Sequence, residues 1–195
     1  MPAYFYITLH IIQALWAVWI AIWIVAAFYT KRTVFRQNRR MRVLFIVMTA
    51  IAVLLMQSQR IRSLFVNYMF FEYPLATCVI GCALCALGLL FSVWARFYLG
   101  RNWSGMITLK ENHELIQSGP YAWVRHPIYT GVLTAIFGTL LALVPTLSGL
   151  LVMVMMTIAF ALKWRGEEIL MNRQFPDAYP AYKRKVPGAI IPWIL

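Results

Sequence analysis

The chain has 195 residues, of which 62% are hydrophobic and 12% are charged. A soluble domain is about 45–50% apolar and about 25% charged, so this composition excludes an ordinary soluble protein and indicates a bilayer environment. The net charge of +12 does not indicate a nucleic-acid partner, because the basic residues lie in short segments between apolar runs, as membrane anchors do.

The first half of the chain predicts three membrane helices. Residues Tyr6 to Tyr29 are long enough to span, since a bilayer core requires about 20 helical residues. A shorter apolar run covers residues 43–56, and a third covers about residues 75–97, whose small residues favour close helix packing. The aromatic side chains of the first helix are expected to face lipid or neighbouring helices rather than a ligand: Trp16, Trp19, Trp23 and Phe28.

The second half predicts a helix hairpin. Residues 132–143 and 147–162 are two apolar runs separated by Val144-Pro145-Thr146. Each run is short for a full span, so a tight antiparallel pair, tilted or partly penetrating, is expected.

The distribution of basic residues predicts the orientation in the membrane. Residues 30–42, 96–127 and 163–195 carry 16 of the 18 Lys and Arg residues. By the positive-inside rule these three segments are cytoplasmic. We therefore expect an all-α integral membrane protein of about five transmembrane segments, with its N-terminus outside and its C-terminus in the cytoplasm.

The longest polar stretch runs from His113 to Gly131 and precedes the hairpin. Pro127 suits the first turn of a helix, where its missing N–H needs no partner. Arg125 and His126 would then lie beside the positive end of that helix, where an anionic group such as the carboxylate of a small cofactor can bind. The residues alone leave a second interpretation open, a cationic anchor at the membrane interface with Tyr and Trp as its aromatic belt.

Glu167 and Glu168 lie in LKWRGEEIL, at the expected end of an apolar helix. Carboxylates are unfavourable there, because of the helix dipole and the nearby hydrocarbon. They either form salt bridges with Lys163, Arg165 or Arg125, or bind a cationic or amine-bearing ligand; both remain open. Tyr179, Tyr182 and the basic residues 183–185 indicate an interfacial lid that meets anionic headgroups.

The sequence lacks the motifs of several other kinds of functional site. Cys82 and Cys85 form CxxC inside an apolar helix without a nearby His, so they are interpreted as packing residues. The three His residues are too scattered for a metal site. No GxGxxG, P-loop or GxSxG occurs, which excludes a soluble-type nucleotide domain and a nucleophile elbow.

Three quoted stretches carry a family resemblance: HELIQSGPYAWVRHPIY at residues 113–129, EEIL at 167–170 and FPDAYPAYKRKVPGAIIP at 175–192, with NWSG at 102–105 as a further match. Together they closely resemble the isoprenylcysteine carboxyl methyltransferase family, over about residues 98–193. Members are integral-membrane enzymes that use S-adenosylmethionine, and the wider group includes phospholipid methyltransferases. The resemblance implies a catalytic part at 98–195, which includes the predicted hairpin at 128–162 and the C-terminal lid. The three helices predicted in 1–97 precede it.

The resemblance also implies the site residues. The cofactor-binding set, with Arg125 added from its place at the helix start, is His113, Glu114, Leu115, Ile116, Tyr121, Arg125, His126, Pro127, Ile128, Tyr129 and Glu168. Glu168 would close the pocket against the amino group of the cofactor. The family tends to have an Arg near the methyl acceptor where this chain has Lys163, with Arg165 two residues later, and Lys cannot provide the bidentate grip of Arg. The predicted catalytic residues are therefore Arg165, Glu168 and Lys163, with no metal.

The expected function is transfer of a methyl group to a lipophilic acceptor, such as an isoprenylcysteine-like carboxylate, at the cytoplasmic side of a membrane. The short chain suggests a prokaryotic member in the cytoplasmic membrane. The expected partners are membrane lipids and the lipophilic or lipidated acceptor, without nucleic acid or metal. The alternatives are a thiol or phospholipid amine as acceptor, an NADPH-dependent membrane reductase of the sterol-reductase type with a similar RHxxY element, and a non-enzymatic membrane protein.

Overall fold

The apolar runs form long helices in a computed structural model that describes residues 2–30, 33–36, 39–57, 74–103, 108–110, 114–144 and 146–192. The long helices are α1 (Ala3–Ala27), α2 (Arg39–Gln57), α4 (Leu75–Leu99), α5 (Pro127–Leu143) and α6 (Leu147–Gln174). Short elements join or follow them: the 3-10 turns η1 (Gly100–Asn102) and η2 (Gly119–Ala122), and helix α7 (Ala178–Lys185).

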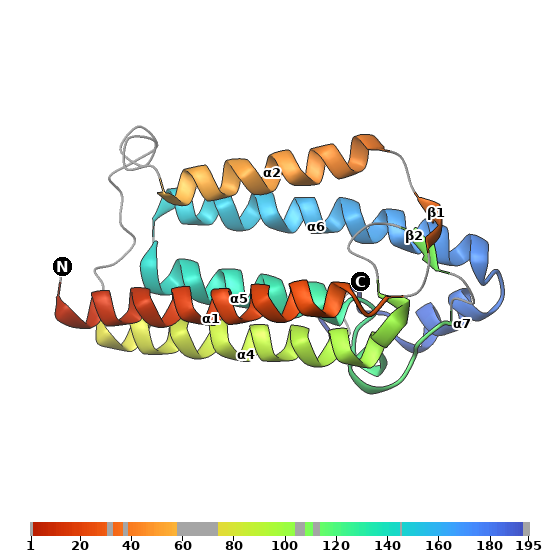
Figure 1. Cartoon of the computed structure of the whole chain (residues 1–195), viewed down its shortest axis with the longest axis horizontal. Coiled ribbons are helices and arrows are strands. Elements are labelled where there is room, and N and C mark those ends of the chain that lie inside the picture. The colour runs from red at the N-terminus through yellow and green to blue at the C-terminus, as the bar shows by residue number, and fades with distance from the viewer. Residues whose placement is uncertain are drawn as a thin grey trace.

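The long helices run side by side with their axes roughly aligned (Figure 1). α5 contacts α1, α4 and α6, and α2 lies along α6. The two short strands and α7 lie at the same end of the bundle. This end is where the turns and the polar segments of the sequence meet.

Within the described residues, three helical stretches are long and apolar enough to cross a membrane: Ala3–Ala27, Leu75–Asn102 and Leu147–Gln174. Val43–Ala52 and Pro127–Leu143 are shorter apolar helices. The prediction of a multi-pass, helical integral membrane protein is therefore confirmed.

The length predicted for the second arm of the hairpin is wrong. α6 does not end near Leu162 but continues to Gln174, a total of 28 residues. Residues 163–174 contain no proline, and Lys, Arg, Glu, Leu and Met are good helix formers, so the charged residues extend the helix instead of ending it. Glu167 and Glu168 consequently lie inside a helix and not at its end.

A small sheet is an addition that the sequence did not predict. β1 (Thr33–Arg36) pairs antiparallel with β2 (Thr108–Lys110), and the register shifts between Thr33 and Phe35. Strands of four and three residues are too short for a period-two pattern to stand out. The pair connects the chain after α1 to the chain after α4.

α4 and α5 approach each other closely through glycine. A Cβ atom placed on Gly88 would lie 2.5 Å from the carbonyl oxygen of Gly131, and one on Gly138 would lie 2.5 Å from the backbone nitrogen of Cys85. Such contacts let the helix backbones pack directly, as in other membrane helix pairs. The predicted small-residue face of α4 is confirmed, and Cys78 and Cys85 are buried in it.

α1 is held by indole hydrogen bonds. Trp16 donates through Nε1 to Oγ1 of Thr139 on α5 at 3.0 Å, and Trp19 donates to Oγ of Ser92 on α4 at 2.7 Å. Hydrogen bonds of this kind fix helix orientation where both partners are away from water. The indole face of α1 is therefore turned toward the bundle.

Candidate active site

A cavity of about 400 Å³ opens among α1, α2, α6, α7 and the segments that follow α4. Its volume lies within the range of small-molecule sites, about 300–1,000 Å³. Its lining residues are Trp19, Trp23, Phe45, Leu99, Asn102, Trp103, Glu114, Leu115, Ile116, Tyr121, Arg125, His126, Ile128, Tyr129, Val132, Phe160, Lys163, Glu167, Leu170, Met171, Tyr179 and Tyr182.

The cavity has two chemically different sides. Trp19, Trp23, Phe45, Val132 and Phe160 contribute apolar and aromatic surface from the membrane helices. The polar lining groups come from the 114–126 segment, the charged part of α6 and the phenols of α7, together with Asn102 of η1 and Tyr129 of α5. A ligand with a polar head and an apolar tail, or two ligands of these two kinds, would match this division.

The residues before α5 are fastened to the C-terminal segment. The backbone N–H of Arg125 donates to the carbonyl of Gly188 at 3.0 Å, and that of His126 donates to Ala189 at 2.8 Å. Pro127 begins α5 as predicted, with His126 as its N-cap residue. These two hydrogen bonds fix the position of the Arg125 and His126 side chains at the start of α5.

A charged cluster lies behind this segment. Arg125 donates through Nε to Oε1 of Glu168 at 2.7 Å, and Lys183 of α7 donates to Oε2 of the same carboxylate at 2.7 Å. Arg125 also donates through Nη1 to the carbonyls of Val186, at 2.8 Å, and Pro187. The salt bridge between Arg125 and Glu168, one of the two readings that the sequence left open, is present.

Glu167, next to it on α6, lies at the cavity surface. Its Oε1 accepts a hydrogen bond of 2.5 Å from the hydroxyl of Tyr129, and its Oε2 lies 3.6 Å from Nδ1 of His126. His126 Nε2 lies 3.5 Å from Oε1 of Glu168, so the imidazole stands between both carboxylates. Burial by itself lowers the pKa of His126, but the two carboxylates outweigh burial and raise that pKa above its ordinary value.

The phenols around the polar side are neutral. Burial raises the pKa values of Tyr121, Tyr179 and Tyr182. Tyr182 donates from its hydroxyl to the carbonyl of Tyr121 at 2.6 Å, which ties α7 to η2 across the cavity.

Lys163 lies where the two sides of the cavity meet. Its Nζ is 5.0 Å from the ring centroid of Phe45 and 5.2 Å from that of Tyr129. Aromatic faces at this distance stabilise a cation. The ammonium group is thus held near the apolar side, one helical turn from Glu167.

The structure brings most of the predicted site residues to the cavity. Of the predicted set, the lining includes Glu114, Leu115, Ile116, Tyr121, Arg125, His126, Ile128, Tyr129 and Lys163. Pro127 is buried within the start of α5, and Glu168 lies behind Arg125 and His126 rather than on the lining. Arg165 is exposed and outside the lining. His113 lies outside the described residues, as do residues 104 and 105 of the NWSG match.

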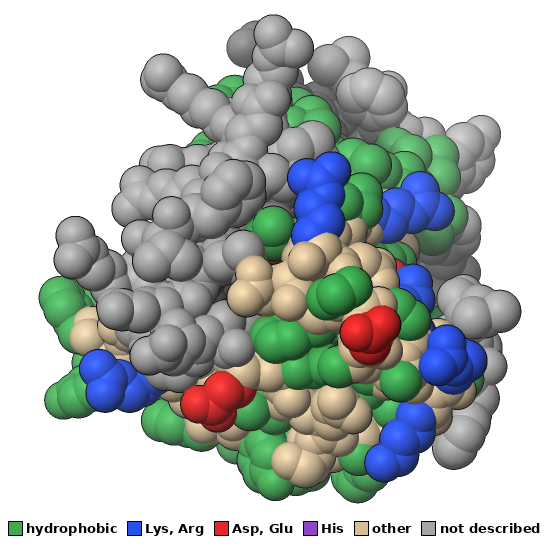
Figure 2. Space-filling model, turned by 90° about the vertical axis from the view of Figure 1, so that its right-hand side faces the viewer, with side chains coloured by type: hydrophobic (Ala, Val, Ile, Leu, Met, Phe, Trp, Pro, Cys, Tyr) green, Lys and Arg blue, Asp and Glu red, His purple; other side chains and the backbone are tan. Residues whose placement is uncertain are grey.

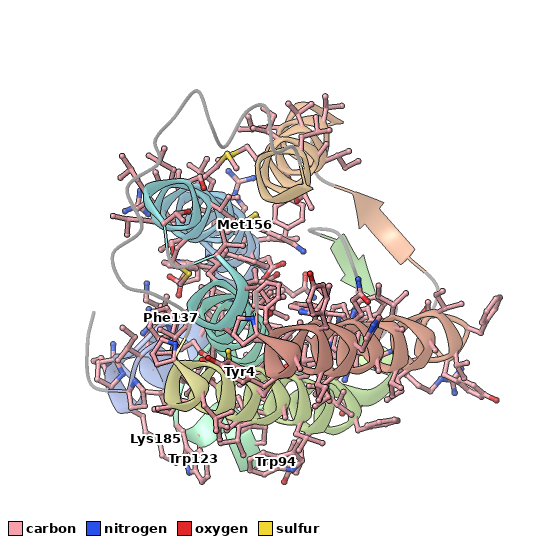
Figure 3. All side chains as sticks on the ribbon, turned by 90° about the vertical axis from the view of Figure 1, so that its left-hand side faces the viewer. Tyr4, Trp94, Trp123, Phe137, Met156 and Lys185 are labelled. Atoms are coloured by element: carbon pink, nitrogen blue, oxygen red, sulfur yellow. The ribbon has the colours of Figure 1, made fainter. Side chains whose placement is uncertain are left out.

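Other lining residues were not predicted. Trp19 and Trp23 of α1 face the cavity, although the sequence favoured lipid or neighbouring helices for them. Their spacing with Trp16 places the three on one helix face, which is the signal that could have identified them. Trp123 of the polar stretch does the opposite: it points outward beside Trp94 (Figure 3), with ring centroids 5.5 Å apart.

The similarity to known proteins covers the part of the chain that contains most of the cavity lining. Residues 79–173 match the model of the isoprenylcysteine carboxyl methyltransferase (ICMT) family. Protein-S-isoprenylcysteine O-methyltransferase of Saccharomyces cerevisiae is 35% identical over 136 residues, which are 67% of this chain and 56% of the yeast protein. The chain thus spans little more than half the length of this relative.

Two further similarities are a sequence relative with a different name and a solved structure. A nickel-cobalt-cadmium resistance protein of Alcaligenes xylosoxydans is 31% identical over 114 residues, 56% of this chain and 50% of that protein. The solved structure of a eukaryotic intramembrane Ras methyltransferase, ICMT, has the same fold, with a TM-score of 0.54 and 20% identity over 79% of this chain and 67% of that one. By the family model and the sequence similarity to these relatives, residues 79–173 of the chain belong to the isoprenylcysteine carboxyl methyltransferase family.

Proposed function

We propose that the protein is a membrane methyltransferase that transfers a methyl group from S-adenosylmethionine to a lipophilic acceptor carrying a carboxylate. One observation carries the proposal: a single cavity joins a polar side built from the family motifs to an apolar side built from membrane helices. The names of the relatives support a methyltransferase that acts on isoprenylcysteine. The metal-resistance name of another relative does not identify an acceptor.

The polar side fits the cofactor. S-adenosylmethionine, when bound, supplies a methyl group on a cationic sulfonium next to a zwitterionic amino-acid group. Glu167 offers a carboxylate to the ammonium of such a group, and His126, as an imidazolium, offers a charge to its carboxylate. Glu168 would act from behind by holding Arg125 and His126 in place.

The chemistry places modest demands on the protein. Methyl transfer from a sulfonium is an in-line displacement, so orientation and exclusion of water provide most of the catalysis. The Tyr129 hydroxyl holds Glu167, and the apolar surface keeps water from the acceptor side. The aromatic rings near Lys163 also favour a cation at the junction of the two sides.

We assign to Lys163 the role of binding the carboxylate of the acceptor. Its ammonium lies between the polar and apolar sides, where an acidic group on a lipophilic chain would meet it. Arg165, the other predicted cation, is exposed. A thiol or amine acceptor would not require this charge, so Lys163 distinguishes the acceptor classes.

The proposed setting follows from the charge distribution. Five membrane segments with the N-terminus outside would place the cavity at the cytoplasmic side of a prokaryotic cytoplasmic membrane, within reach of the soluble cofactor. Residues 98–195 would form the catalytic part with α7 as its lid, while α1 and α2 add Trp19, Trp23 and Phe45 to the wall.

Binding of S-adenosylhomocysteine to detergent-purified protein, measured by calorimetry with NADPH as a second ligand, tests the cofactor. We expect binding that is lost in Glu167→Gln and His126→Ala but kept in Asp177→Asn, which removes an exposed acid outside the cavity. Binding of NADPH alone would replace the proposal with the reductase. A folded sample that binds neither ligand would favour the non-enzymatic alternative.

A transfer assay with an S-prenylated N-acetylcysteine as acceptor tests the role of Lys163. Lys163→Met should raise the KM for this acid while cofactor binding persists, and Arg165→Met should leave both unchanged. Equal effects of the two substitutions would contradict the assignment.

A further inference from the structure

We propose that the exposed cations of α7, Arg184 and Lys185, bind the headgroups of anionic membrane lipids, and that this contact holds α7 closed over the cavity. The lipid contact stands on the structure alone; its effect on cofactor affinity rests on the proposed function.

The first step is the depth of α7. α6 has 28 residues, about 42 Å at 1.5 Å per residue. A hydrocarbon core is about 30 Å thick, or about 40–45 Å with the headgroup layers. If the apolar Leu147 end lies at the far edge of the hydrocarbon, the last turns of α6 lie among the headgroups, and α7 follows at that level.

The second step is the division of α7 into two faces. Tyr179 and Tyr182 are buried and pack with Val186, so this face of α7 packs against the rest of the protein. Lys183 is committed as well, because its Nζ lies 2.7 Å from Glu168. Arg184 and Lys185, next in the chain, are exposed, and the first turn of α7 contains no acid.

The surrounding surface is basic. Figure 2 views the end of the molecule where α7 and the strands lie, and the described Lys and Arg side chains there outnumber the acidic ones. Basic side chains at a membrane surface attract anionic lipid headgroups. Cations at the end of a helix also offset the helix dipole, but that effect does not depend on the lipid.

The third step is the connection to the cavity. The turn that carries Arg184 and Lys185 is fastened on both sides: Tyr182 donates to the carbonyl of Tyr121, and Arg125 donates to the carbonyl of Val186. Tyr179 and Tyr182 themselves line the cavity. A headgroup that holds this turn from outside therefore favours the arrangement in which the lid and the polar wall are joined.

The experiment uses the full chain in nanodiscs of phosphatidylcholine alone or of phosphatidylcholine with phosphatidylglycerol. Two quantities are measured: the unfolding temperature without cofactor, and the affinity for S-adenosylhomocysteine. The test variant is Arg184→Gln/Lys185→Gln. The matched control is Arg101→Gln/Arg165→Gln, which removes two exposed cations from other elements.

We expect phosphatidylglycerol to raise the unfolding temperature of the wild type and to tighten ligand binding by about fivefold, the lower end of typical coupling between sites. Both effects should vanish in the α7 variant, persist in the control and weaken with salt. Equal loss in the control, no lipid dependence in the wild type, or the same effect from inorganic phosphate added to phosphatidylcholine discs would each overturn the proposal. A lipid-dependent unfolding temperature in a protein that never binds S-adenosylhomocysteine would support the lipid site and refute the proposed function.

Discussion

Arg125 and Glu168 form a buried ion pair at 2.7 Å, with side chains that are 6% and 11% exposed, although they lie 43 residues apart in the chain. The pair links the segment before α5 to α6, and Lys183 adds α7 to the same carboxylate. Three elements that line the cavity are thereby held at one point.

Removing either partner should destabilise the protein strongly. Arg125→Met leaves the Glu168 carboxylate with Lys183 and His126 as its cationic neighbours, and breaking a buried pair typically costs about 3–5 kcal/mol. Thermal unfolding in detergent of the two single variants and of Arg125→Met/Glu168→Met measures the coupling. The double variant should lose less than the sum of the singles, by about 0.5–3 kcal/mol. Strict additivity would mean that the pair does not act as a unit.

Tyr129→Phe should weaken cofactor binding while preserving the fold. It removes the hydroxyl that donates to Glu167 but keeps the ring beside Lys163 and Phe160. Hydrogen bonds to charged groups contribute about 1.5–3 kcal/mol, so we expect roughly a tenfold loss of affinity for S-adenosylhomocysteine by calorimetry. Tyr6→Phe, which changes an exposed phenol of α1, is the control. Unchanged affinity in Tyr129→Phe would remove Glu167 from the binding wall.

The stability of the protein should fall as pH rises above the ordinary pKa of histidine, 6.5. The folded state raises the pKa of His126, so it favours the imidazolium between Glu167 and Glu168. This contribution is complete below about pH 6.5 and is lost as pH rises through the higher folded value. Unfolding temperatures from slightly acidic to mildly alkaline pH should show the decline in the wild type and a flatter curve in His126→Gln. A wild-type curve that rises through this interval would contradict the assignment.

Arg96→Met should loosen the contact between the ends of α1 and α4. The buried guanidinium donates to the carbonyl of Ala26 at 2.5 Å and to that of Gly100 at 2.8 Å, and it lies 4.4 Å from the ring centroid of Trp103. Two hydrogen bonds from a charged donor are lost, at about 1.5–3 kcal/mol each.

The first readout is a lower unfolding temperature. The second is a red-shifted tryptophan emission, because the guanidinium of Arg96 covers the ring of Trp103, which is in edge-to-face contact with Trp23. Arg96→Lys keeps the charge but not the planar fork, so it should recover only part of the loss. Full recovery by Lys would show that charge alone matters.

The helix positions were largely predictable, because apolar length and the small-residue face of α4 are local properties of the sequence. The motif residues of the 114–129 segment were predictable from resemblance. Two features were not. The extension of α6 was missed because charged residues mark a membrane boundary without ending a helix, and the sheet was missed because its strands are too short to give a pattern.

The sequence by itself determined that the chain is a membrane protein, which apolar runs form helices, and which stretch contains the polar site residues. These three properties depend on hydrophobicity and residue type along the chain. Only the tertiary structure decided which of two adjacent glutamates faces the cavity: Glu167 does, while Glu168 is held by Arg125 and Lys183. It also decided that Lys163 and not Arg165 reaches the cavity, and that Trp19 and Trp23 line it. Side chains one or two residues apart on a helix point in different directions, so their roles depend on which neighbouring helices pack beside them.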